Sequence, residues 1–270
     1  MKYDMIISDF DWTLGCAPGI IEEGTLKAVK EYVKKGGIFV ICTGRMYRAI
    51  QPVCEKYDIK GLIACYQGCL IEDTEGNKVL DQGLSPEVAA DVVEKLSSEK
   101  VTVIADIDDE LYYEEESEYL NIYQNLIGLK GKKINDLKNF VIKKGKSVQK
   151  VCALCDDNTN QRIRDKYNAY YNGEKVLFNS GARCLVEAIN PKYDKGHAVK
   201  FLAKHYDIPL SKIMTVGDST NDVPLLSGEW HGVAVGDAKE EAKKAAKEIT
   251  VPFNENPVKV LIEKYCLNND

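Results

Sequence analysis

The sequence has few histidines and no long apolar run. Only 3 of its 270 residues are His, and no stretch approaches the roughly 20 apolar residues that a membrane-spanning helix needs. Its first seven residues, Met-Lys-Tyr-Asp-Met-Ile-Ile, lack the apolar segment of a secretory signal peptide. We therefore expect a cytoplasmic protein with no membrane partner.

Positive charge is also limited, and it is scattered along the chain. There are 36 Lys and Arg against 42 Asp and Glu, which gives a formal net charge of -6. A protein that binds nucleic acid usually carries a basic patch, and no such cluster is evident here. We expect no nucleic-acid partner and favour a small molecule instead.

The nine cysteines do not form a regular pattern. Their number is odd and their spacing shows no disulfide ladder, so reduced thiols in the core are expected. Cys152 and Cys155 form a CxxC within an apolar, strand-like run, and no second CxxC accompanies it. We therefore assign this pair no metal or redox role.

The two ends of the chain alternate between strand-like and helix-like segments. Apolar runs at residues 4–8, 38–42 and 62–65 read as buried strands, and residues 23–35 and 46–57 have helical spacing between them. A similar alternation returns after residue 196, with strands expected at 213–216 and 232–235. Helices are expected there at residues 196–206, 239–247 and from 257 onward. This order predicts an α/β fold with a parallel sheet and right-handed crossovers.

The middle of the chain has a different pattern. A hairpin is expected at residues 70–82, and short alternating strands with amphipathic helices follow it. The expected strands are residues 101–106, 111–113, 148–155, 175–179 and 184–189. We predict an α+β domain, residues 84–189, inserted into a core made of residues 1–83 and 190–270. Tyr112 and Tyr113 of this insert are expected to face solvent.

Chemically active side chains gather in four short segments. The segments are Asp9 to Thr13, Thr43-Gly44-Arg45, the region around Lys195, and Gly217 to Asp222. We expect each to fall just past the end of a predicted strand, which places them together at the carboxyl edge of a parallel sheet, and Lys195 also begins a predicted helix. Thr43, Gly44 and Arg45 offer donors to an oxyanion, and Lys195 lies at a helix N-terminus, which favours anions.

The carboxylates in these segments predict a bound cation. Asp9, Asp11, Asp218 and Asp222 would repel one another strongly in a cleft unless positive charge were present. Oxygen ligands without a Cys or His cluster favour a hard ion such as Mg²⁺. Lys195 would supply the remaining fixed positive charge.

Taken in order, the four segments resemble the motifs of the haloacid dehalogenase superfamily. They are Asp-x-Asp-x-Thr at residues 9–13, Thr43, Lys195 and Gly-Asp-x-x-Asn-Asp at residues 217–222. Thr43-Gly44-Arg45 and the position of the insert are similar to the Cof-type phosphatases with a C2B cap. Two departures stand out: Trp12 occupies a position that usually holds Gly, and Tyr66-Gln67-Gly68 stands where Asn-Asn-Gly is common.

The resemblance implies a Mg²⁺-dependent phosphatase that hydrolyses a small phosphomonoester, such as a sugar phosphate, through an aspartyl phosphate. Asp9 would be the nucleophile and Asp11 the general acid and base. The resemblance assigns the phosphate to Thr43, Gly44, Arg45, Lys195 and Asn221. It assigns the metal to Asp9, Asp218, Asp222 and the main-chain carbonyl of Asp11, and Asn221 and Asp222 could also orient Lys195 or metal-bound water.

Three questions remain open on the sequence alone: the reaction, the role of Arg45 and the position of Trp12. A phosphomutase of the same superfamily would return the phosphoryl group to substrate, and a non-catalytic homologue would only bind a ligand. Arg45 could contact substrate or form a structural ion pair. For Trp12 we expect a negative φ, with the ring packed near Thr13 or the hinge of the insert, and a ring that lines the site and selects leaving groups is the sharper hypothesis.

Overall fold

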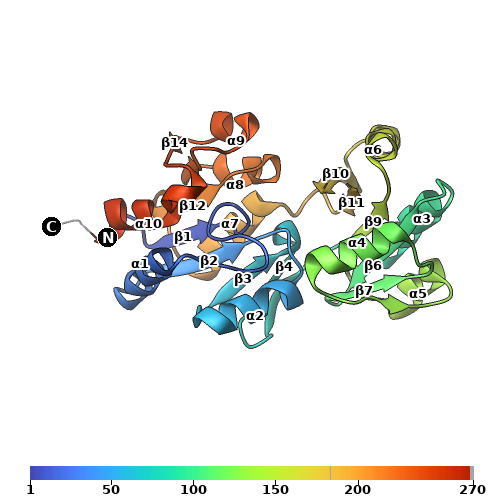
Figure 1. The fold of residues 1–270 in the computed structure, drawn as a ribbon, viewed down its shortest axis with the longest axis horizontal. Helices are drawn as coiled ribbons and strands as arrows, with labels where there is room; N and C mark the ends of the chain where they lie inside the picture. Colours follow the sequence, from blue (N-terminus) through green and yellow to red (C-terminus); the bar gives the residue numbers. More distant parts are fainter. Residues whose placement is uncertain (183, 268–270) are drawn as a thin grey trace. The chain divides into compact units, whose positions relative to one another are not determined.

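The computed structural model describes residues 1–182 and 184–267, and the chain divides into two compact units (Figure 1). The core unit comprises Met1–Val79 and Tyr193–Asp270, and the inserted unit comprises Leu80–Lys192. The unit boundaries lie four residues before the predicted position 83 and three after position 190. One reason is that residues before Leu84 already bind the inserted unit: Asp81 accepts a hydrogen bond from Gln149 at 2.9 Å, and the amide of Gly83 donates to Ser147 at 2.6 Å.

An eight-stranded sheet forms the centre of the core unit. Its strand order is β14-β13-β12-β1-β2-β3-β4-β5, and neighbours are parallel from β14 to β3, whereas β4 runs antiparallel to β3. The strands are β1 (Met5–Ser8), β2 (Ile38–Cys42), β3 (Leu62–Cys65), β4 (Leu70–Asp73), β5 (Lys78–Asp81), β12 (Ile213–Gly217), β13 (His231–Ala234) and β14 (Glu248–Ile249). The central strand β1 is fully buried, as its run of apolar residues predicts.

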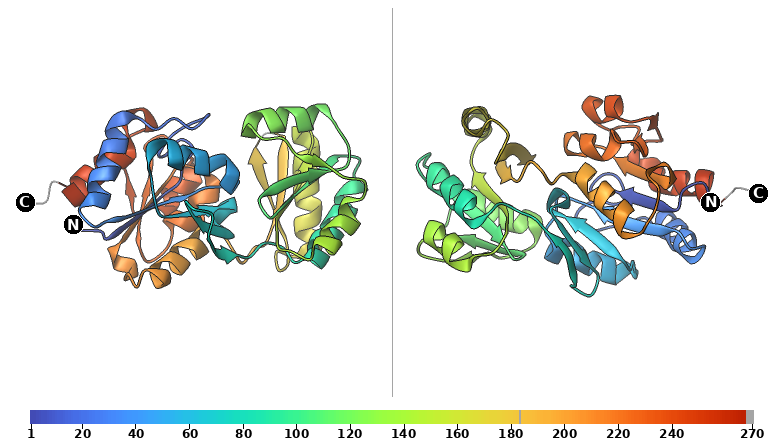
Figure 2. Two further views of the ribbon diagram at one scale, coloured as in Figure 1. Left: turned by 90° about the horizontal axis from the view of Figure 1, so that it is seen from below. Right: turned by 180° about the vertical axis from the view of Figure 1, so that it is seen from behind.

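Helices cover both faces of this sheet (Figure 2). From β1 the chain steps outward to β3 in one direction, and from β12 it steps to β14 in the other. Because parallel crossovers are right-handed, the two halves place their helices on opposite faces. The helices are α1 (Glu23–Lys34), α2 (Tyr47–Tyr57), α7 (Lys195–His205), α8 (Val223–Leu226), α9 (Glu240–Ala245) and α10 (Pro257–Ile262).

The inserted unit is built on a second sheet with the strand order β10-β11-β9-β6-β7-β8. Its neighbours are antiparallel except β7 and β8. The strands are β6 (Thr102–Ile107), β7 (Glu110–Tyr113), β8 (Lys132–Lys133), β9 (Val148–Leu154), β10 (Leu177–Ala182) and β11 (Leu185–Ile189). The helices are α3 (Pro86–Ser97), α4 (Glu118–Ile127), α5 (Leu137–Lys144) and α6 (Asp157–Tyr171).

The insert has its own apolar core, which accounts for one wrong expectation. Tyr112 and Tyr113 are only 6% and 9% exposed instead of facing solvent. Tyr112 belongs to the buried cluster between this sheet and its helices, and its ring lies 4.6 Å from that of Phe140. The acidic residues that follow these tyrosines suggested exposure, but alternation along β7 turns each ring against buried neighbours.

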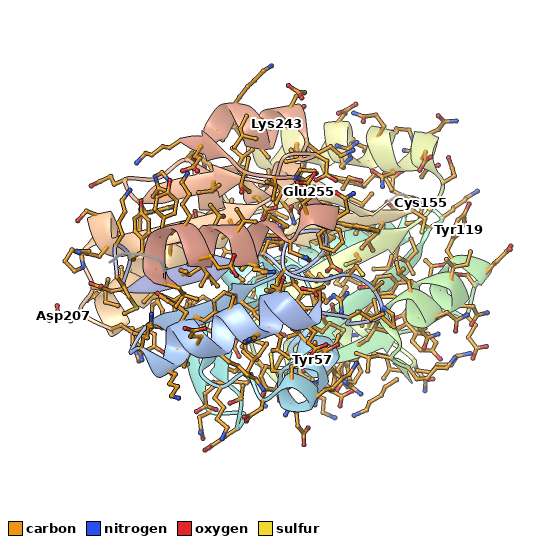
Figure 3. All side chains as sticks on the ribbon, turned by 60° about the vertical axis from the view of Figure 1, so that its left-hand side comes forward. Tyr57, Tyr119, Cys155, Asp207, Lys243 and Glu255 are labelled. Atoms are coloured by element: carbon orange, nitrogen blue, oxygen red, sulfur yellow. The ribbon has the colours of Figure 1, made fainter. Side chains whose placement is uncertain are left out.

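The cysteines are mostly buried and unlinked. Seven of the nine are buried, and all nine are free thiols. Cys152 lies within β9, and Cys155, labelled in Figure 3, follows the strand and is 3% exposed. Within residues 1–182 and 184–267, no helix combines the length and the apolar character that a membrane crossing requires.

Candidate active site

Three neighbouring strands of the core sheet deliver the candidate residues to one edge. β1 lies between β2 and β12 and is parallel to both, so Asp9, Thr43 and Asp218 each follow the carboxyl end of a strand. The hydrogen bonding between β1 and β12 continues one residue beyond β1, where the amide of Asp9 donates to the carbonyl of Val216 at 2.9 Å. The predicted convergence of these side chains therefore follows from the topology.

Lys195 lies at the centre of the site and is completely buried. It is the first residue of α7, which begins after the N-cap Asp194, whose side chain accepts from the amide of His197. The Nζ of Lys195 donates to Asp9 Oδ1 at 2.5 Å and to Asp222 Oδ1 at 2.6 Å. The ammonium group of Lys195 thus links Asp9 to Asp222, two residues that are distant in sequence, and holds the side chain of Asp9 in place.

The loop after β12 is fixed by its own carboxylate. Asp222 is fully buried, and its Oδ2 accepts from the amides of Asp218 and Ser219 at 3.0 and 2.9 Å. Asp218 in turn accepts a hydrogen bond from the hydroxyl of Thr13 at 3.0 Å through Oδ1. Both oxygens of Asp222 are therefore engaged by the protein, so its contacts suit it to orient Lys195 and shape the loop.

The charges at this edge leave room for a divalent cation. Asp9, Asp218 and Asp222 have carboxylate oxygens within 4.8 Å of one another. Three carboxylates and the one ammonium group of Lys195 sum to a formal charge of -2. In the described part of the chain, Asp9 Oδ2 and Asp218 Oδ2 accept no hydrogen bond. Two carboxylate oxygens available beside a net charge of -2 fit a hard cation such as Mg²⁺.

The pKa values at this edge reflect the same crowding. Burial raises the pKa of Asp9 well above its usual range, and Asp222 and Asp218 add to this effect while Lys195 opposes it. Burial and the Asp222 carboxylate raise the pKa of Asp218 to about 6. Burial alone would lower the pKa of Lys195, but Asp222 and Asp9 outweigh it and the pKa is raised. Lys195 therefore stays cationic, and both carboxylates would be favoured in their charged form by added positive charge.

Asp11 lies apart from this carboxylate cluster and pairs with Arg45. The guanidinium group donates through Nε to Asp11 Oδ2 at 2.8 Å and through Nη2 to Oδ1 at 2.6 Å. Arg45 also lies over the ring of Phe10, at 4.7 Å from its centroid. Of the two roles expected for Arg45, the structure contains the ion pair, and this fork fixes the position of the Asp11 side chain.

The phosphate-binding candidates of the second strand lie beside a residue that the sequence left without a role. The hydroxyl of Thr43 accepts from the amide of Arg45 at 3.2 Å. A Cβ added at Gly44 would lie 2.5 Å from Nε2 of Gln67. Asn221 donates through Nδ2 to Oε1 of Gln67 at 3.1 Å. Gln67 and Thr13 therefore belong to the site. Thr13 is part of the first motif, whereas the sequence marks Gln67 only as a departure from Asn-Asn-Gly and assigns it no role.

The expected negative φ of Trp12 is wrong. The residue has φ 63° and its side chain is 60% exposed. The turn is tight, because the amides of Thr13, Leu14 and Gly15 all point to the carbonyl of Phe10, while the amide of Trp12 donates to Gly15. The ring contacts Phe253 edge to face, with centroids 5.4 Å apart. The position therefore keeps the left-handed backbone that favours Gly, with an exposed aromatic ring in its place.

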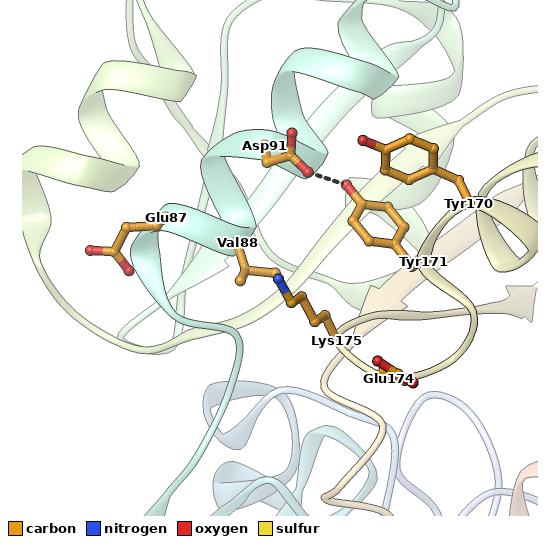
Figure 4. A pocket seen from close by; sticks show the side chains of 7 residues that line it. All are labelled: Glu87, Val88, Asp91, Tyr170, Tyr171, Glu174 and Lys175. Carbon is orange, nitrogen blue, oxygen red and sulfur yellow. Dashed lines mark hydrogen bonds between the residues drawn. The ribbon is translucent and has the colours of Figure 1, made fainter.

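The inserted unit has a separate concave surface, which the sequence did not predict. Its volume is about 430 Å³, and Figure 4 shows its lining from α3, α6 and the turn after α6. The carboxylate of Asp91 is already engaged there, since it accepts from Tyr171 at 2.6 Å and from Lys95 at 2.5 Å. The remaining lining residues are Glu87, Val88, Tyr170, Glu174 and Lys175.

The chain is similar to known proteins over nearly its whole length. The family model of the haloacid dehalogenase-like hydrolases matches residues 6–262. Phosphatase YwpJ of Bacillus subtilis is 24% identical, and the match covers 94% of this chain and 96% of that protein. The 5-amino-6-(5-phospho-D-ribitylamino)uracil phosphatase YwtE of the same organism is also 24% identical, over 96% of both proteins.

Solved structures share the whole fold. TM0651 from Thermotoga maritima superposes with a TM-score of 0.86 at 24% identity, and 97% of each chain is covered. A haloacid dehalogenase-like hydrolase from Bacteroides thetaiotaomicron gives 0.85 at 22% identity, covering 97% of this chain and 99% of that one. The expected fold class is confirmed. The chain belongs to the family of haloacid dehalogenase-like hydrolases, as its four motifs predicted.

Proposed function

We propose that the protein is a Mg²⁺-dependent phosphatase that hydrolyses a small phosphomonoester through a phosphorylated Asp9. The observation that carries this proposal is the buried contact between Lys195 and Asp9. A carboxylate that serves as a nucleophile must be held in one orientation, and its charge must be balanced while an anionic ester approaches. Lys195, itself anchored on Asp222, meets both needs.

The residues at the sheet edge fit the expected cation. Asp9 and Asp218 would hold Mg²⁺ through their side chains, with the carbonyl of Asp11 and the carboxylate of Asp222 next to them. When bound, the ion would neutralise carboxylate and phosphate charge, which is the largest obstacle to bringing the two together. The donor set consists of oxygen atoms alone, in keeping with this choice.

The chain's own residues then divide the reaction into two displacements. An oxygen of Asp9 attacks phosphorus, and the bond between phosphorus and the ester oxygen breaks. The ester oxygen keeps both electrons of that bond and receives a proton from Asp11. Water next attacks the phosphorus of the aspartyl phosphate, loses a proton to the Asp11 carboxylate, and releases Asp9 with inorganic phosphate. The product alcohol and phosphate account for all atoms of ester and water.

The bound phosphate would meet donors from both flanking loops. We assign its oxygens to Thr43, Gly44, Lys195 and Asn221, with Arg45 nearby. Arg45 now forks onto Asp11. A doubly charged phosphate would compete for that guanidinium group, so we expect Arg45 to shift toward substrate and leave Asp11 able to exchange a proton.

Phosphate release from a panel of phosphomonoesters tests this function. The panel should contain hexose phosphates and 5-amino-6-(5-phospho-D-ribitylamino)uracil, because YwtE is named for the latter. We expect turnover with Mg²⁺ and none with EDTA. Asp9→Asn should fall below about one thousandth of wild-type activity, since the nucleophile is lost. Isomerisation of hexose phosphates without phosphate release would indicate the mutase instead.

Asp58→Asn provides the matched control. Asp58 is an exposed residue whose side chain forms a 3.6 Å ion pair with exposed Lys60, and its left-handed backbone (φ 52°) suits Asn. This variant should keep wild-type activity. Full turnover by Asp9→Asn would refute the covalent mechanism, and a protein without turnover on any ester would refute the phosphatase.

A further inference from the structure

The segment after β3 has an unusual backbone. Tyr66, Gln67 and Gly68 have φ values of 49°, 62° and 98°, three left-handed residues in a row. Such a conformation is uncommon for residues with a side chain, and for bulky Tyr66 it is unfavourable. Two hydrogen bonds hold the segment on the phosphate-binding loop, from Tyr66 N to Arg45 O at 3.1 Å and from Gln67 N to Thr43 O at 3.0 Å.

Gly68 ties the same segment to the helix that carries Lys195. A Cβ at this position would lie 2.8 Å from the carbonyl of Asp194 and from the Cβ of Ala198. The chain therefore needs Gly here, both for its φ of 98° and for the close approach to α7. The strained turn is thus fixed between two elements of the site.

The result of this turn is the placement of the Gln67 amide. Its Oε1 accepts from Asn221, which follows β12, and its Nε2 lies over Gly44, which follows β2. The hydrogen bond from Asn221 keeps the carbonyl oxygen of the Gln67 amide toward Asn221 and its NH₂ group toward Gly44. Among the residues that the structure describes, Nε2 of Gln67 has no hydrogen-bond acceptor. A donor without a partner is therefore held over the phosphate-binding glycine.

We propose that Gln67 is a further phosphate-binding residue, whose Nε2 donates to an oxygen of the substrate phosphate beside Gly44. This inference rests on the proposed function and deepens it by adding one residue to the same site. Asn221 acts on Gln67 as a positioning residue through its hydrogen bond to Oε1. The absence of a side chain at residue 44 then has a spatial reason, because any Cβ would displace the amide.

The substitution Gln67→Glu distinguishes a role of Gln67 in phosphate binding from a purely structural role in linking the two loops. The variant keeps the shape and the acceptor for Asn221, but it removes both N–H donors and adds a negative charge. We expect the KM for the best ester to rise at least about 10-fold and kcat to fall less, since a hydrogen bond to a charged group is lost. The thermal unfolding midpoint should stay within about 2 °C of wild type.

A second variant removes the charge effect. Gln67→Met keeps the length of the side chain without donor or acceptor, and we expect its KM to rise about 10-fold as well. Gln51→Glu is the matched control, because Gln51 lies on α2 and its side chain makes a long 3.5 Å contact with the carbonyl of Thr74. Its KM should equal that of wild type. Wild-type KM values in both Gln67 variants would overturn the inference.

Binding of inorganic phosphate gives a readout that does not require turnover. Calorimetry in the presence of Mg²⁺ should show about 10-fold weaker binding by Gln67→Glu than by wild type. That result supports the role of Gln67 even for a chain that hydrolyses no ester of the panel, whereas the missing turnover refutes the phosphatase alone. Equal affinities of wild type and variant, or no phosphate binding by either, overturn the inference.

Discussion

The backbone of Trp12 lies in the left-handed region while its bulky ring is 60% exposed. An L-residue in this conformation costs about 1–2 kcal/mol, and burial of the ring does little to offset that. The compensation within the chain is the edge-to-face contact with Phe253. Trp12 directly follows Asp11, the residue proposed to protonate the leaving oxygen, in the turn after β1. The strained position is therefore well placed to influence which leaving groups fit.

Trp12→Gly should change selectivity far more than stability. The variant relieves backbone strain, which stabilises the folded chain. It also loses an aromatic contact of about 0.5–1.5 kcal/mol, and Gly raises the entropy of the unfolded chain, which destabilises the folded one by about 0.5–1 kcal/mol. These effects offset one another, so we expect the unfolding midpoint to move by no more than about 4 °C. The ratio of kcat/KM between bulky and small esters should change at least about 3-fold, as a contact of this size allows.

Two other results would contradict that interpretation of Trp12. Unchanged relative rates across the ester panel would show that the ring does not select leaving groups. Phe253→Leu removes the edge-to-face partner and leaves Trp12 in place. It should therefore give a smaller change in the rate ratio than Trp12→Gly, and an equal or larger change would assign the selectivity to Phe253.

The residues of the site could be located from sequence to different degrees. Asp9, Lys195 and Asp218 could be found because each borders a predicted strand or helix, and topology then brings such positions together. The φ of Trp12 could not, since it depends on how three amides converge on the carbonyl of Phe10. The sequence marks Gln67 only as a departure from Asn-Asn-Gly and assigns it no role, because its partners, Gly44 and Asn221, are near it only in space.

At the scale of elements, the packing of α7 against α8 determines where Lys195 lies. A Cβ at Gly196 would come 2.6 Å from the carbonyl of Pro224, which belongs to α8. Lys195 precedes this contact on α7, and Asp222 precedes α8. The close approach of the two helices therefore brings the ammonium group and its carboxylate partner together.

Gly196→Ala should separate these two helices and lower both stability and activity. Overpacking of this kind costs about 1–3 kcal/mol, because a backbone carbonyl cannot move aside. Displacement of Lys195 by a fraction of an ångström should lower kcat about 10- to 100-fold. Lys200→Ala, at an exposed position of the same helix, is the control and should match wild type in both measurements. Wild-type kcat in Gly196→Ala would contradict this view of α7.

The elements themselves were predictable where their pattern was strong. The central strands β1, β2 and β3 are runs of apolar residues, and their alternation with helical segments is typical of buried parallel strands. β14 (Glu248–Ile249) escaped prediction because a strand of two residues has no periodicity. The burial of Tyr112 was missed for another reason, since the adjacent acidic residues resemble a solvated face and only the packing of Phe140 shows otherwise.

For the whole molecule, the carboxylate cluster makes stability depend on pH. The pKa of Asp218 is raised to about 6 from its usual 3.8, so the folded chain binds more protons than the unfolded chain between these values. The contribution of the Asp218 carboxyl group to stability therefore falls as pH rises from about 4 to 6 and stays lower above that range. Asp9, whose pKa is also raised, contributes in the same direction. All of these groups belong to the core unit.

Added Mg²⁺ should reverse this loss, and only in the core unit. A cation that binds the folded carboxylates stabilises by about 2.7 kcal/mol at one hundred times its Kd. Calorimetry of the full chain at pH 7.5 should show a higher unfolding temperature for the core transition, while the transition of the inserted unit stays fixed. At pH 5 protonated Asp218 competes with the ion, so the shift should shrink. Asp218→Asn should lose most of the shift at pH 7.5, and a shift that is equal at both pH values would place the ion elsewhere.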